Sequence, residues 1–214
     1  LTHMISCGNQ AALSLEDFLS FLIDEPGVRA IGLHIEGLRS IAGFHDVALR
    51  ANRKGIPVVA LKTGSSSIGS SLTVSHTGSL SGSDSLYDAL FARCGVIRVE
   101  SPPELLETLK FFVHSGVPLA NRVAGFTCSG GGATMLADRA ERIGLIFPPV
   151  PETTRTALTQ LLPPIATVSN PLDYTTPIWG DAVRTAPVFA EAMDQVNAAA
   201  AVLVQDYPAP GLDE

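Results

Sequence analysis

Short apolar runs that suit β-strands alternate with helical patterns along almost the whole chain, and this alternation limits the possible folds more than any other feature. The runs are rich in β-branched residues and are bounded by Gly, Pro or polar turn residues. Strands that alternate with helices form parallel sheets, and the connecting helices cover the faces of those sheets. The sequence therefore predicts an α/β fold with parallel sheets.

The periodic segments can be located by their patterns and by their end signals. Ser14 and Asp17 form a capping-box pattern, and Ser101 with Pro102 and Glu104 forms a strong helix start. Gly55 stands where one helix pattern ends. The expected strands are residues 4–6, 29–35, 57–62, 96–99, 122–128 and 199–205. The expected helices are residues 15–22, 40–54, 84–93, 101–114, 133–143, 151–162 and 181–195.

A linker-like stretch at residues 116–121 separates two copies of the alternating pattern. Each half is about 100 residues long, which is an ordinary domain size. We therefore expect two three-layer α/β domains, one at residues 1–118 and one at residues 119–214. The first domain is expected to be incomplete at its amino-terminal end, and the second at its carboxyl-terminal end.

The charge balance and the cysteines exclude several classes of protein. The chain has 214 residues and a formal net charge of −7, without a Lys/Arg cluster, so we expect no nucleic-acid and no membrane-surface partner. Its apolar runs are all shorter than the roughly 18 residues of a membrane span. The three cysteines are widely spaced without a paired motif, which argues against a zinc site or a disulfide framework and favours a reducing compartment, the cytoplasm.

A histidine in a Ser/Gly-rich loop is the first candidate for chemistry. The stretch Ser75-His76-Thr77-Gly78-Ser79-Leu80 follows the strand at 57–62 and leads into a helical pattern. A neutral imidazole can act as a nucleophile near pH 7, and helix N-termini bind phosphate through their N–H groups. His76 is thus a candidate phosphoryl carrier, with Thr77 and Gly78 as candidate phosphate-binding residues. A solvated histidine without function is the alternative at this position.

Glu36 follows the strand at 29–35 and is the second candidate. Ligands of parallel α/β sheets gather at the carboxyl ends of the strands, where this residue is expected. A carboxylate that accepts a hydrogen bond from one imidazole nitrogen leaves the other nitrogen free to attack phosphorus. An exposed glutamate without a role is equally compatible with the pattern. His34, on the same strand, is expected to be a partly buried structural residue.

Ser129, Gly130, Gly131 and Gly132 are expected to form a turn between a strand and a helix. Glycines let a backbone approach an anion closely, so the turn could cradle phosphate, although a tight turn without a ligand fits equally well. The full dinucleotide fingerprint, the Walker A loop, the G-x-S-x-G elbow and H-E-x-x-H do not occur, and no metal site is expected. The stretch 169–173 reads as an Asx/Pro turn.

Several of these segments together resemble the NDP-forming acyl-CoA synthetases, relatives of succinyl-CoA synthetase. The resemblance covers nearly the whole chain, and its most specific part is the Ser-His-Thr-Gly block with the Gly-Val-Ile-Arg-Val strand that follows. It rests on Gly8-Asn9-Gln10, Ile35-Glu36-Gly37, residues 57–62, 75–82 and 94–99, Gly130-Gly131-Gly132 and Asn170-Pro171-Leu172-Asp173.

The resemblance implies two flavodoxin-like, succinyl-CoA synthetase-like domains and an acid–CoA ligase reaction. Members interconvert an acid, CoA and ATP with acyl-CoA, ADP and phosphate, through an acyl phosphate and a phosphohistidine. By resemblance His76 is the phosphohistidine, Glu36 is the carboxylate that holds it, and Gly130–Gly132 open a helix that faces the phosphate. CoA and ATP or ADP with Mg would serve the complete enzyme, and phosphate would bind in the present chain.

The resemblance is incomplete, and this affects what the chain can do alone. The CoA-binding Rossmann domain and the ATP-grasp domain or subunit lie outside the sequence, so we do not expect the chain by itself to complete the reaction. Residues 64–69 are Ser-rich where relatives often have Arg and an acidic residue. One alternative is the acyl-CoA-binding regulatory region of a protein lysine acetyltransferase, without ligase activity. Another is an α/β interaction module without a site.

Overall fold

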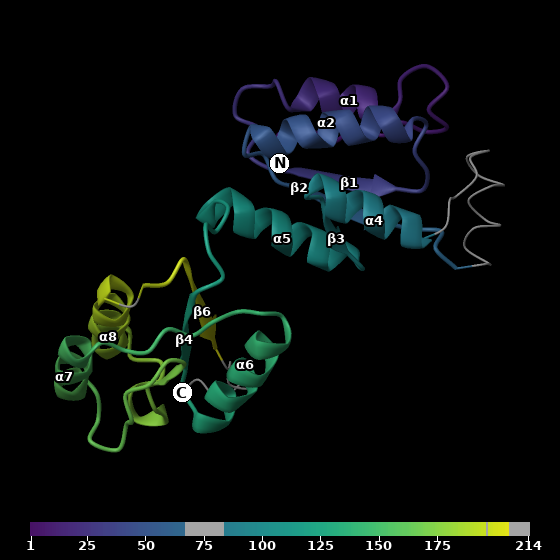
Figure 1. Cartoon of the computed structure of the whole chain (residues 1–214). Coiled ribbons are helices and arrows are strands. Elements are labelled where there is room, and N and C mark those ends of the chain that lie inside the picture. The colour runs from purple at the N-terminus through teal and green to yellow at the C-terminus, as the bar shows by residue number, and fades with distance from the viewer. Residues whose placement is uncertain (67–83, 196, 206–214) are drawn as a thin grey trace, which may run out of the picture. The chain divides into compact units, whose positions relative to one another are not determined.

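The protein forms two compact units, Leu1–Val117 and Pro118–Glu214 (Figure 1). The computed structural model describes residues 1–66, 84–195 and 197–205. Each unit combines a parallel β-sheet with α-helices. The prediction of an α/β fold with parallel sheets is confirmed.

The sheet of the first unit contains three parallel strands in the order β1-β2-β3. Their bounds are β1 (Ile31–Ile35), β2 (Val58–Lys62) and β3 (Ile97–Val99). Each strand starts one or two residues later than the sequence pattern predicts. In the register of β1 and β2, Ile31 pairs with Val58 and Ile35 pairs with Lys62. The carboxyl ends of these two strands therefore lie side by side.

The helices of the first unit begin where their capping residues predict. The side chain of Ser14 accepts a hydrogen bond from the Asp17 N–H in a complete capping box, and Ser101 caps its helix through the Glu104 N–H. Ser40 caps the second helix in the same way. The helices are α1 (Leu15–Leu22), α2 (Ile41–Arg53), α4 (Asp84–Cys94) and α5 (Pro102–Ser115).

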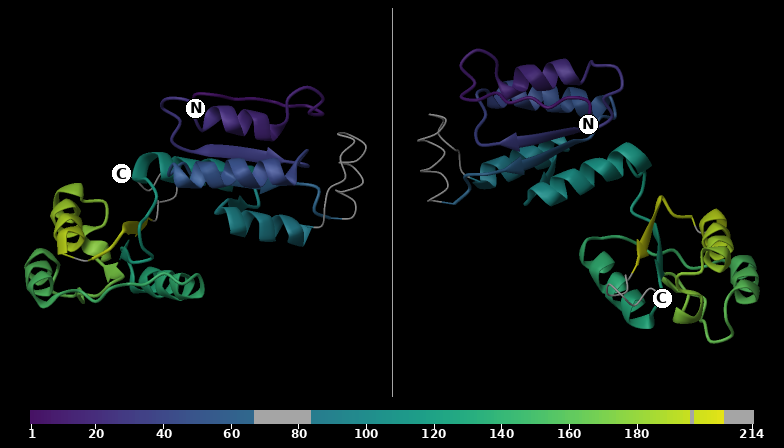
Figure 2. Two further views of the ribbon diagram at one scale, coloured as in Figure 1. Left: turned by 45° about the horizontal axis from the view of Figure 1, so that its top comes forward. Right: turned by 180° about the vertical axis from the view of Figure 1, so that it is seen from behind.

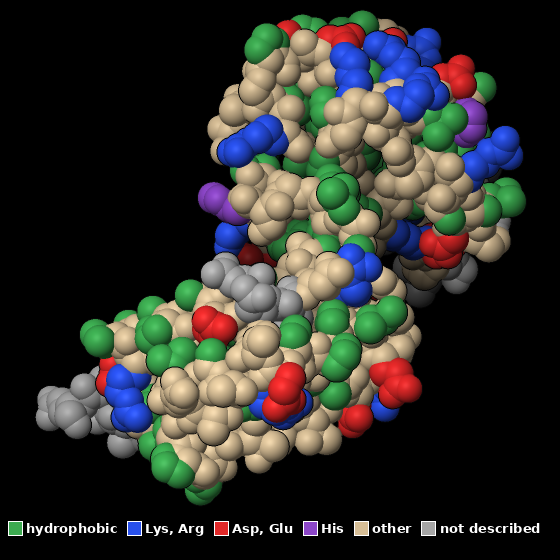
Figure 3. Space-filling view, turned by 60° about the vertical axis from the view of Figure 1, so that its left-hand side comes forward, with side chains coloured by type: hydrophobic (Ala, Val, Ile, Leu, Met, Phe, Trp, Pro, Cys, Tyr) green, Lys and Arg blue, Asp and Glu red, His purple; other side chains and the backbone are tan. Residues whose placement is uncertain are grey.

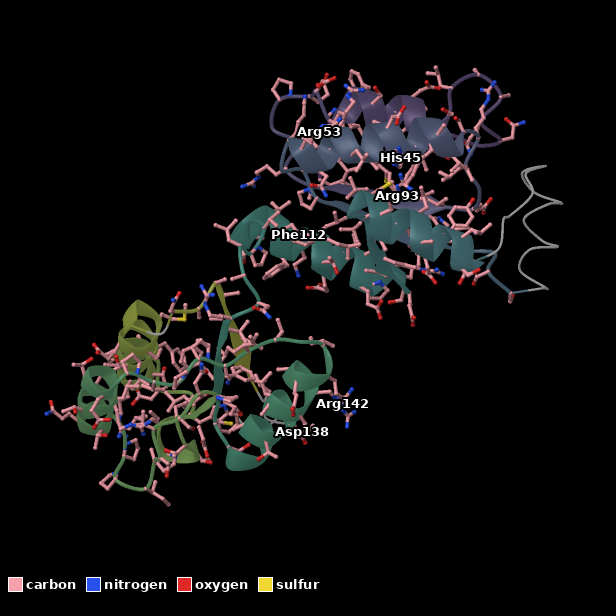
Figure 4. All side chains as sticks on the ribbon, in the orientation of Figure 1. His45, Arg53, Arg93, Phe112, Asp138 and Arg142 are labelled. Atoms are coloured by element: carbon pink, nitrogen blue, oxygen red, sulfur yellow. The ribbon has the colours of Figure 1, made fainter. Side chains whose placement is uncertain are left out.

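Alternate residues of β2 belong to two different apolar clusters, one on each face of the sheet. Val58 and Ala60 belong to the larger cluster, which includes side chains of α1, α2 and α4. Val59 and Leu61 form a smaller cluster with Val99, against which Leu105, Leu109 and Phe112 of α5 pack. Figure 4 labels Phe112 on α5. The larger cluster contains the residues Leu15, Leu19, Ile35, Phe44, Val47, Tyr87 and Phe91, among others.

The second unit also combines a parallel sheet with helices (Figure 2). The strand order of this sheet is β5-β4-β6. Its central strand β4 (Val123–Thr127) pairs in parallel with β5 (Leu172–Asp173) and β6 (Ala200–Val204). The other elements are α6 (Gly130–Arg142), α7 (Glu152–Leu161), the 3-10 helix η1 (Thr176–Ile178) and α8 (Ala182–Gln195). Figure 1 shows α6 on one side of the sheet and α7 and α8 on the other.

A glycine in the centre of β4 allows α6 to pack closely against the sheet. A Cβ atom on Gly125 would lie 2.8 Å from Leu136 Cδ2 of α6 and 2.9 Å from Pro171 Cβ. The opposite face of the sheet buries Phe126, Leu158 and Val188 in the main apolar cluster of this unit. Side chains therefore cover both faces of β4, as expected for a parallel strand.

The expected strand at residues 4–6 is wrong. Residues 1–6 are all exposed, and within the described residues they pair with no strand. The run Met4-Ile5 is apolar, but a strand also needs a neighbour that takes its backbone N–H and C=O groups. Apolar character alone therefore did not identify a strand here.

The stretch at residues 169–173 also differs from the expected turn, because its last two residues form strand β5. Phe126 pairs with Leu172, and Thr127 pairs with Asp173. The peptide bond between Asn170 and Pro171 is cis, and it directly precedes the strand. Turn-forming residues here lead into a short strand that depends on β4.

Some helices carry charged side chains that suit the helix dipole. Arg50 and Arg53 occupy the last turn of α2, where positive charge is favourable.

The space-filling view shows Lys and Arg side chains gathered on one part of the first unit (Figure 3). No helix in the described ranges is both long enough and apolar enough to cross a bilayer.

Candidate functional site

Glu36 lies at the carboxyl edge of the sheet in the first unit, where the sequence pattern places it. It follows β1 directly and is half-buried. The next strand ends at Lys62, and the Thr63 N–H donates a 3.0 Å hydrogen bond to the Ile35 carbonyl. The edge that carries Glu36 is thus also the edge from which the chain leaves β2 toward residue 76.

His34 differs from its prediction, because it is exposed rather than partly buried. Its Nε2 lies 3.0 Å from Thr63 Oγ1. The apolar cluster formed with α5 centres on β2 and β3, and β1 is the edge strand beside it. Leu109 of α5 covers this face of β1 at Gly32, but His34 lies two residues nearer the carboxyl edge and remains in contact with solvent.

Three of the predicted site residues, His76, Thr77 and Gly78, lie outside the residues that the structure describes. Their roles remain predictions from the sequence. The described segments on either side end at Ser66 and resume with α4 at Asp84.

The remaining predicted site residues meet at the start of α6 in the second unit. Ser129 is the N-cap, and its side chain accepts a 3.1 Å hydrogen bond from the Gly132 N–H. The predicted helix start at residue 133 is wrong, because Gly130, Gly131 and Gly132 form the first turn of the helix. Glycine has low helix propensity, but the serine cap and the tertiary packing outweigh this preference.

Only one of the three glycines is required by its contacts. A Cβ atom at residue 132 would lie 2.3 Å from Thr127 Oγ1, and Thr127 is fully buried. A Cβ atom at residue 131 would have no heavy atom within 4 Å. The backbone at Gly131 is therefore open to an approaching ligand, whereas Gly132 is needed for close packing of α6 against β4.

This difference predicts opposite effects of alanine at two adjacent positions. We expect Gly132→Ala to lower the free energy of unfolding by about 1–3 kcal/mol, because the new methyl group meets buried Thr127. Gly131→Ala, the matched control, should leave it unchanged or raise it by up to about 1 kcal/mol through helix propensity. Urea unfolding of the intact protein measures both values, and equal effects of the two variants would contradict the packing explanation.

A carboxylate already lies beside the first turn of α6. Asp173 Oδ2 is 3.6 Å from the position of a Cβ atom on Gly130, and Asp173 Oδ1 accepts a 2.9 Å hydrogen bond from the Thr175 N–H. A negative charge at this place interacts favourably with the helix N-terminus. It would also repel a phosphate dianion that approached the same N–H groups, so the dipole of α6 alone does not guarantee phosphate binding.

A charged cluster in the first unit was not predicted from the sequence. Arg98 of β3 donates to both carboxylate oxygens of Asp84, at 2.8 and 3.0 Å, and it also pairs with Asp88. Lys62 lies close enough that Asp84 and Glu36 both affect its pKa. A lysine at the end of an otherwise apolar strand was a visible signal, but its partners lie far away in the sequence.

A groove occurs at the opposite, amino-terminal edge of the same sheet. It is lined by Arg29, Lys54 and His114, among others. Ligands of parallel α/β sheets bind at the carboxyl edge, so this groove is not the candidate site. Over the described ranges, no cluster of His, Cys, Asp or Glu is suited to hold a metal ion.

Comparison with known proteins decides the family. Residues 1–112 match the family described as succinyl-CoA ligase like flavodoxin domain. The chain belongs to this family. Its relationship to NDP-forming acyl-CoA synthetases, which the sequence motifs indicated, is confirmed by its relatives.

Two curated proteins related to this chain are an ADP-forming acetate–CoA ligase and the alpha subunit of another. The alpha subunit of acetate–CoA ligase II of Pyrococcus furiosus is 38% identical over 191 residues, which are 89% of this chain and 41% of the subunit. The enzyme of Methanocaldococcus jannaschii is 34% identical over 85% of this chain and 25% of the enzyme. The chain therefore spans less than half the length of these relatives.

A solved structure agrees with these relatives. The dinucleotide forming acetyl-coenzyme A synthetase 1 of Ca. Korarchaeum cryptofilum, in complex with phosphate and ADP, matches with a TM-score of 0.84 and 25% identity. The match covers 96% of this chain and 44% of that protein. These similarities favour the ligase interpretation over the regulatory alternative.

Proposed function

We propose that the chain supplies two domains of an NDP-forming acyl-CoA synthetase. The complete enzyme would interconvert a carboxylic acid, CoA and ATP with acyl-CoA, ADP and phosphate, through an acyl phosphate and a phosphohistidine. Residues 1–118 would form the phosphohistidine-bearing domain, and residues 119–214 a second flavodoxin-like CoA-ligase domain. The two compact units and the family match to residues 1–112 support this division.

The position of Glu36 is the structural observation that most supports this proposal. Glu36 lies at the carboxyl edge of a parallel sheet, beside the strand whose continuation carries His76. Its carboxylate would accept a hydrogen bond from one nitrogen of the His76 imidazole and so fix the tautomer. The other nitrogen would then carry the phosphoryl group between the nucleotide and the acyl phosphate.

The start of α6 would provide a second contact to the phosphoryl group. Gly130 and Gly131 are exposed, and their N–H groups belong to the first turn of the helix. Ser129, Thr77 and Gly78 would add hydrogen-bond donors. Such donors stabilise the charge of a transferring phosphoryl group, provided that they overcome the repulsion from Asp173.

The other requirements of the reaction would come from the remainder of the enzyme. An ATP-grasp domain or subunit would bind the nucleotide with Mg, and a Rossmann domain would bind CoA. The similarity of this chain to a protein solved with phosphate and ADP supports the nucleotide and phosphate requirement. We place the enzyme in a reducing compartment, the cytoplasm, because its three cysteines are widely spaced without a paired motif.

Phosphoryl labelling of the complete enzyme, with its ATP-grasp domain or subunit, tests the proposal. Incubation with ATP labelled in the γ-phosphate should give a covalent label that is stable in alkali and labile in acid, as expected for phosphohistidine. Addition of the acid substrate and CoA should discharge the label. A protein that accepts no label, or one whose label resists acid, would not be the proposed synthetase.

Replacement of Glu36 tests the role of the carboxylate. We expect Glu36→Gln to slow formation of the phosphoenzyme about 10–100-fold, by analogy with the loss of a group that orients a metal-binding histidine. Glu107→Gln is the matched control, because Glu107 is exposed and, among the described residues, pairs with Lys110 on the same helix. Rapid-quench labelling measures both rates, and equal rates would remove Glu36 from the site.

A further inference from the structure

The chain leaves β1 at Glu36 and continues as a loop to Ser40, the N-cap of α2. Residues 36–40 belong to no helix or strand, so their backbone groups need partners from elsewhere in the fold. A loop that carries a functional carboxylate has to hold it precisely, because a displacement of about 1 Å can slow a reaction about 100-fold. The partners of this loop therefore determine where Glu36 stands.

The peptide that joins Gly37 to Leu38 is held at both of its polar groups. Gln10 Nε2 donates a 3.1 Å hydrogen bond to the Gly37 carbonyl, and the Leu38 N–H donates a 3.3 Å hydrogen bond to the Tyr87 hydroxyl. The two groups belong to one planar trans peptide and point in opposite directions. Two bonds on opposite sides fix the rotation of this peptide, which begins one residue after Glu36.

Gln10 is itself fixed by its neighbours. Its Oε1 accepts a 2.9 Å hydrogen bond from the N–H of Leu15, the first residue of α1, so Nε2 is the end of the amide that meets Gly37. Its main-chain carbonyl accepts a 3.2 Å hydrogen bond from Arg39 Nη1. The φ angle of Gln10 is 57°, which is uncommon for a residue other than glycine. Such strain persists where surrounding contacts fix the backbone, and it is frequent at functional sites.

Tyr87 provides the second anchor from α4. Its side chain is buried, and its ring meets the ring of Phe91 edge-on at a centroid distance of 5.8 Å. Lys62 Nζ lies 4.7 Å from the centre of the Tyr87 ring. These contacts hold the ring, and therefore the hydroxyl oxygen that accepts from Leu38, in one place. The two anchors thus come from segments that lie far apart in the sequence, residue 10 and α4.

We propose that Gln10 is a positioning residue, whose side-chain amide fixes the Gly37–Leu38 peptide together with the Tyr87 hydroxyl and so holds Glu36 at the carboxyl edge of the sheet. This inference rests on the proposed function, because Glu36 is the carboxylate assigned to orient the phosphoryl-carrying imidazole. The proposed mechanism otherwise gives Gln10 no task. Gln10 acts on the reaction only through the backbone beside Glu36.

Hydrogen exchange at the Leu38 amide tests this role without reference to activity. In the complete enzyme, Gln10→Met removes the donor to the Gly37 carbonyl, and we expect exchange of the Leu38 N–H to rise about 3–10-fold, because the peptide then opens locally more often. Amides of β2 should keep their wild-type rates. Gln160→Met, at an exposed glutamine of α7, is the matched control. An unchanged rate at Leu38, or an equal rise throughout β2, would overturn the proposal.

A double-mutant cycle tests whether this contact matters for phosphoryl transfer. We expect Gln10→Met to slow phosphoenzyme formation about 10-fold without changing the KM for ATP, because it displaces Glu36 and leaves the nucleotide site intact. The double variant with Glu36→Gln should be no slower than Glu36→Gln alone, since both changes act on one carboxylate. Multiplicative slowing would show that Gln10 acts independently of Glu36 and would contradict the inference.

Gln10→Glu isolates the hydrogen bond to Gly37. An ionised carboxylate still accepts from the Leu15 N–H, but it has no N–H to donate. Exchange at Leu38 and the rate of phosphoenzyme formation should therefore change at least as much as in Gln10→Met. Wild-type values for both would mean that the bond to Gly37 contributes nothing, and the inference would be wrong. If Gln10→Met does not fold, this variant decides the question.

The two kinds of measurement separate this inference from the proposed function. If the wild-type enzyme forms no phosphohistidine, the proposed function fails, and the role of Gln10 in the reaction fails with it. Exchange at Leu38 still shows in that case whether Gln10 holds the peptide. If the phosphohistidine forms and Gln10→Met is as fast as the wild type, only the inference about Gln10 is overturned.

Discussion

Replacement of His76 by asparagine should abolish the acid-labile phosphoryl label and reduce acyl-CoA synthesis by at least about 1000-fold. Asparagine is similar in size and polarity but has no nucleophilic nitrogen, so the covalent route through the imidazole is lost. Rapid-quench labelling with γ-labelled ATP and an assay of CoA-dependent phosphate release measure the two effects. Because the phosphoryl group has no other proposed carrier, both quantities should fall together.

His114→Asn provides the matched control for this prediction. His114 is exposed in the last turn of α5 and lines the groove at the opposite edge of the sheet from Glu36. The variant should keep full labelling and full activity. A label of normal size in His76→Asn would assign the phosphoryl group to another residue, and the proposed mechanism would then be wrong.

The final amount of label distinguishes the residue that carries the phosphoryl group from the residue that orients it. Glu36→Gln leaves the nucleophile in place, so its label should form slowly but reach the same final amount as in the wild type. The His76→Asn variant should never reach the wild-type amount of label. A final amount of label that is reduced in both variants to the same degree would indicate that Glu36 affects folding and not the orientation of the imidazole.

The parts of the fold that could be predicted from the sequence depend on local chemistry. Ser14 and Ser101 predict helix starts because the cap and the capped N–H group lie within three residues of each other. The strand 57–62 was predictable because a run of buried residues is typical of a parallel strand. Parallel pairing followed from the alternation of elements.

The parts that could not be predicted depend on contacts between distant segments. Residues 4–6 have the composition of a strand, but strand formation depends on a neighbour that their own sequence does not reveal. The three glycines 130–132 read as a turn because glycine disfavours helices, yet Thr127 requires a residue without a side chain at the third of these positions. Local propensity and tertiary packing disagree here, and the packing determines the structure.

The candidate site shows the same division. Glu36 was predictable as a residue at the carboxyl edge because the end of β1 could be recognised. The environment of Lys62 could not be predicted, because Tyr87 and Asp84 on α4 and Arg98 on β3 approach it only in the folded chain. The sequence identifies residues that can carry chemistry, whereas the fold determines which charges surround them.

Asn170 provides the prediction with the largest expected effect on stability. Its side chain joins three backbone groups around β4: Oδ1 accepts from the Gly125 N–H at 2.9 Å, and Nδ2 donates to the Val123 and Pro148 carbonyls, both at 3.0 Å. Gly125 and Val123 are buried in the central strand of the second unit. The sequence suggested only a turn here, but the amide ties the segment before β5 to β4.

We expect Asn170→Ala to lower the free energy of unfolding of the second unit by about 2–4 kcal/mol. Each lost hydrogen bond contributes about 1 kcal/mol, and buried backbone groups left without a partner add a desolvation cost. Hydrogen exchange of the intact protein measures the effect at the Gly125 amide, which loses its acceptor. Protection of residues 123–127 should fall, whereas protection of β2 in the first unit should not change.

Two further variants separate loss of the amide from general disturbance. Asn197→Ala removes an exposed asparagine that accepts from Arg122, and should cost less than about 1 kcal/mol. Asn170→Asp keeps the acceptor for the Gly125 N–H but places a negative charge against two carbonyl oxygens, so it should destabilise at least as much as alanine. If Asn170→Asp were as stable as the wild type, the two donated bonds would contribute nothing, and the attachment of this segment to β4 would have to come from apolar packing alone.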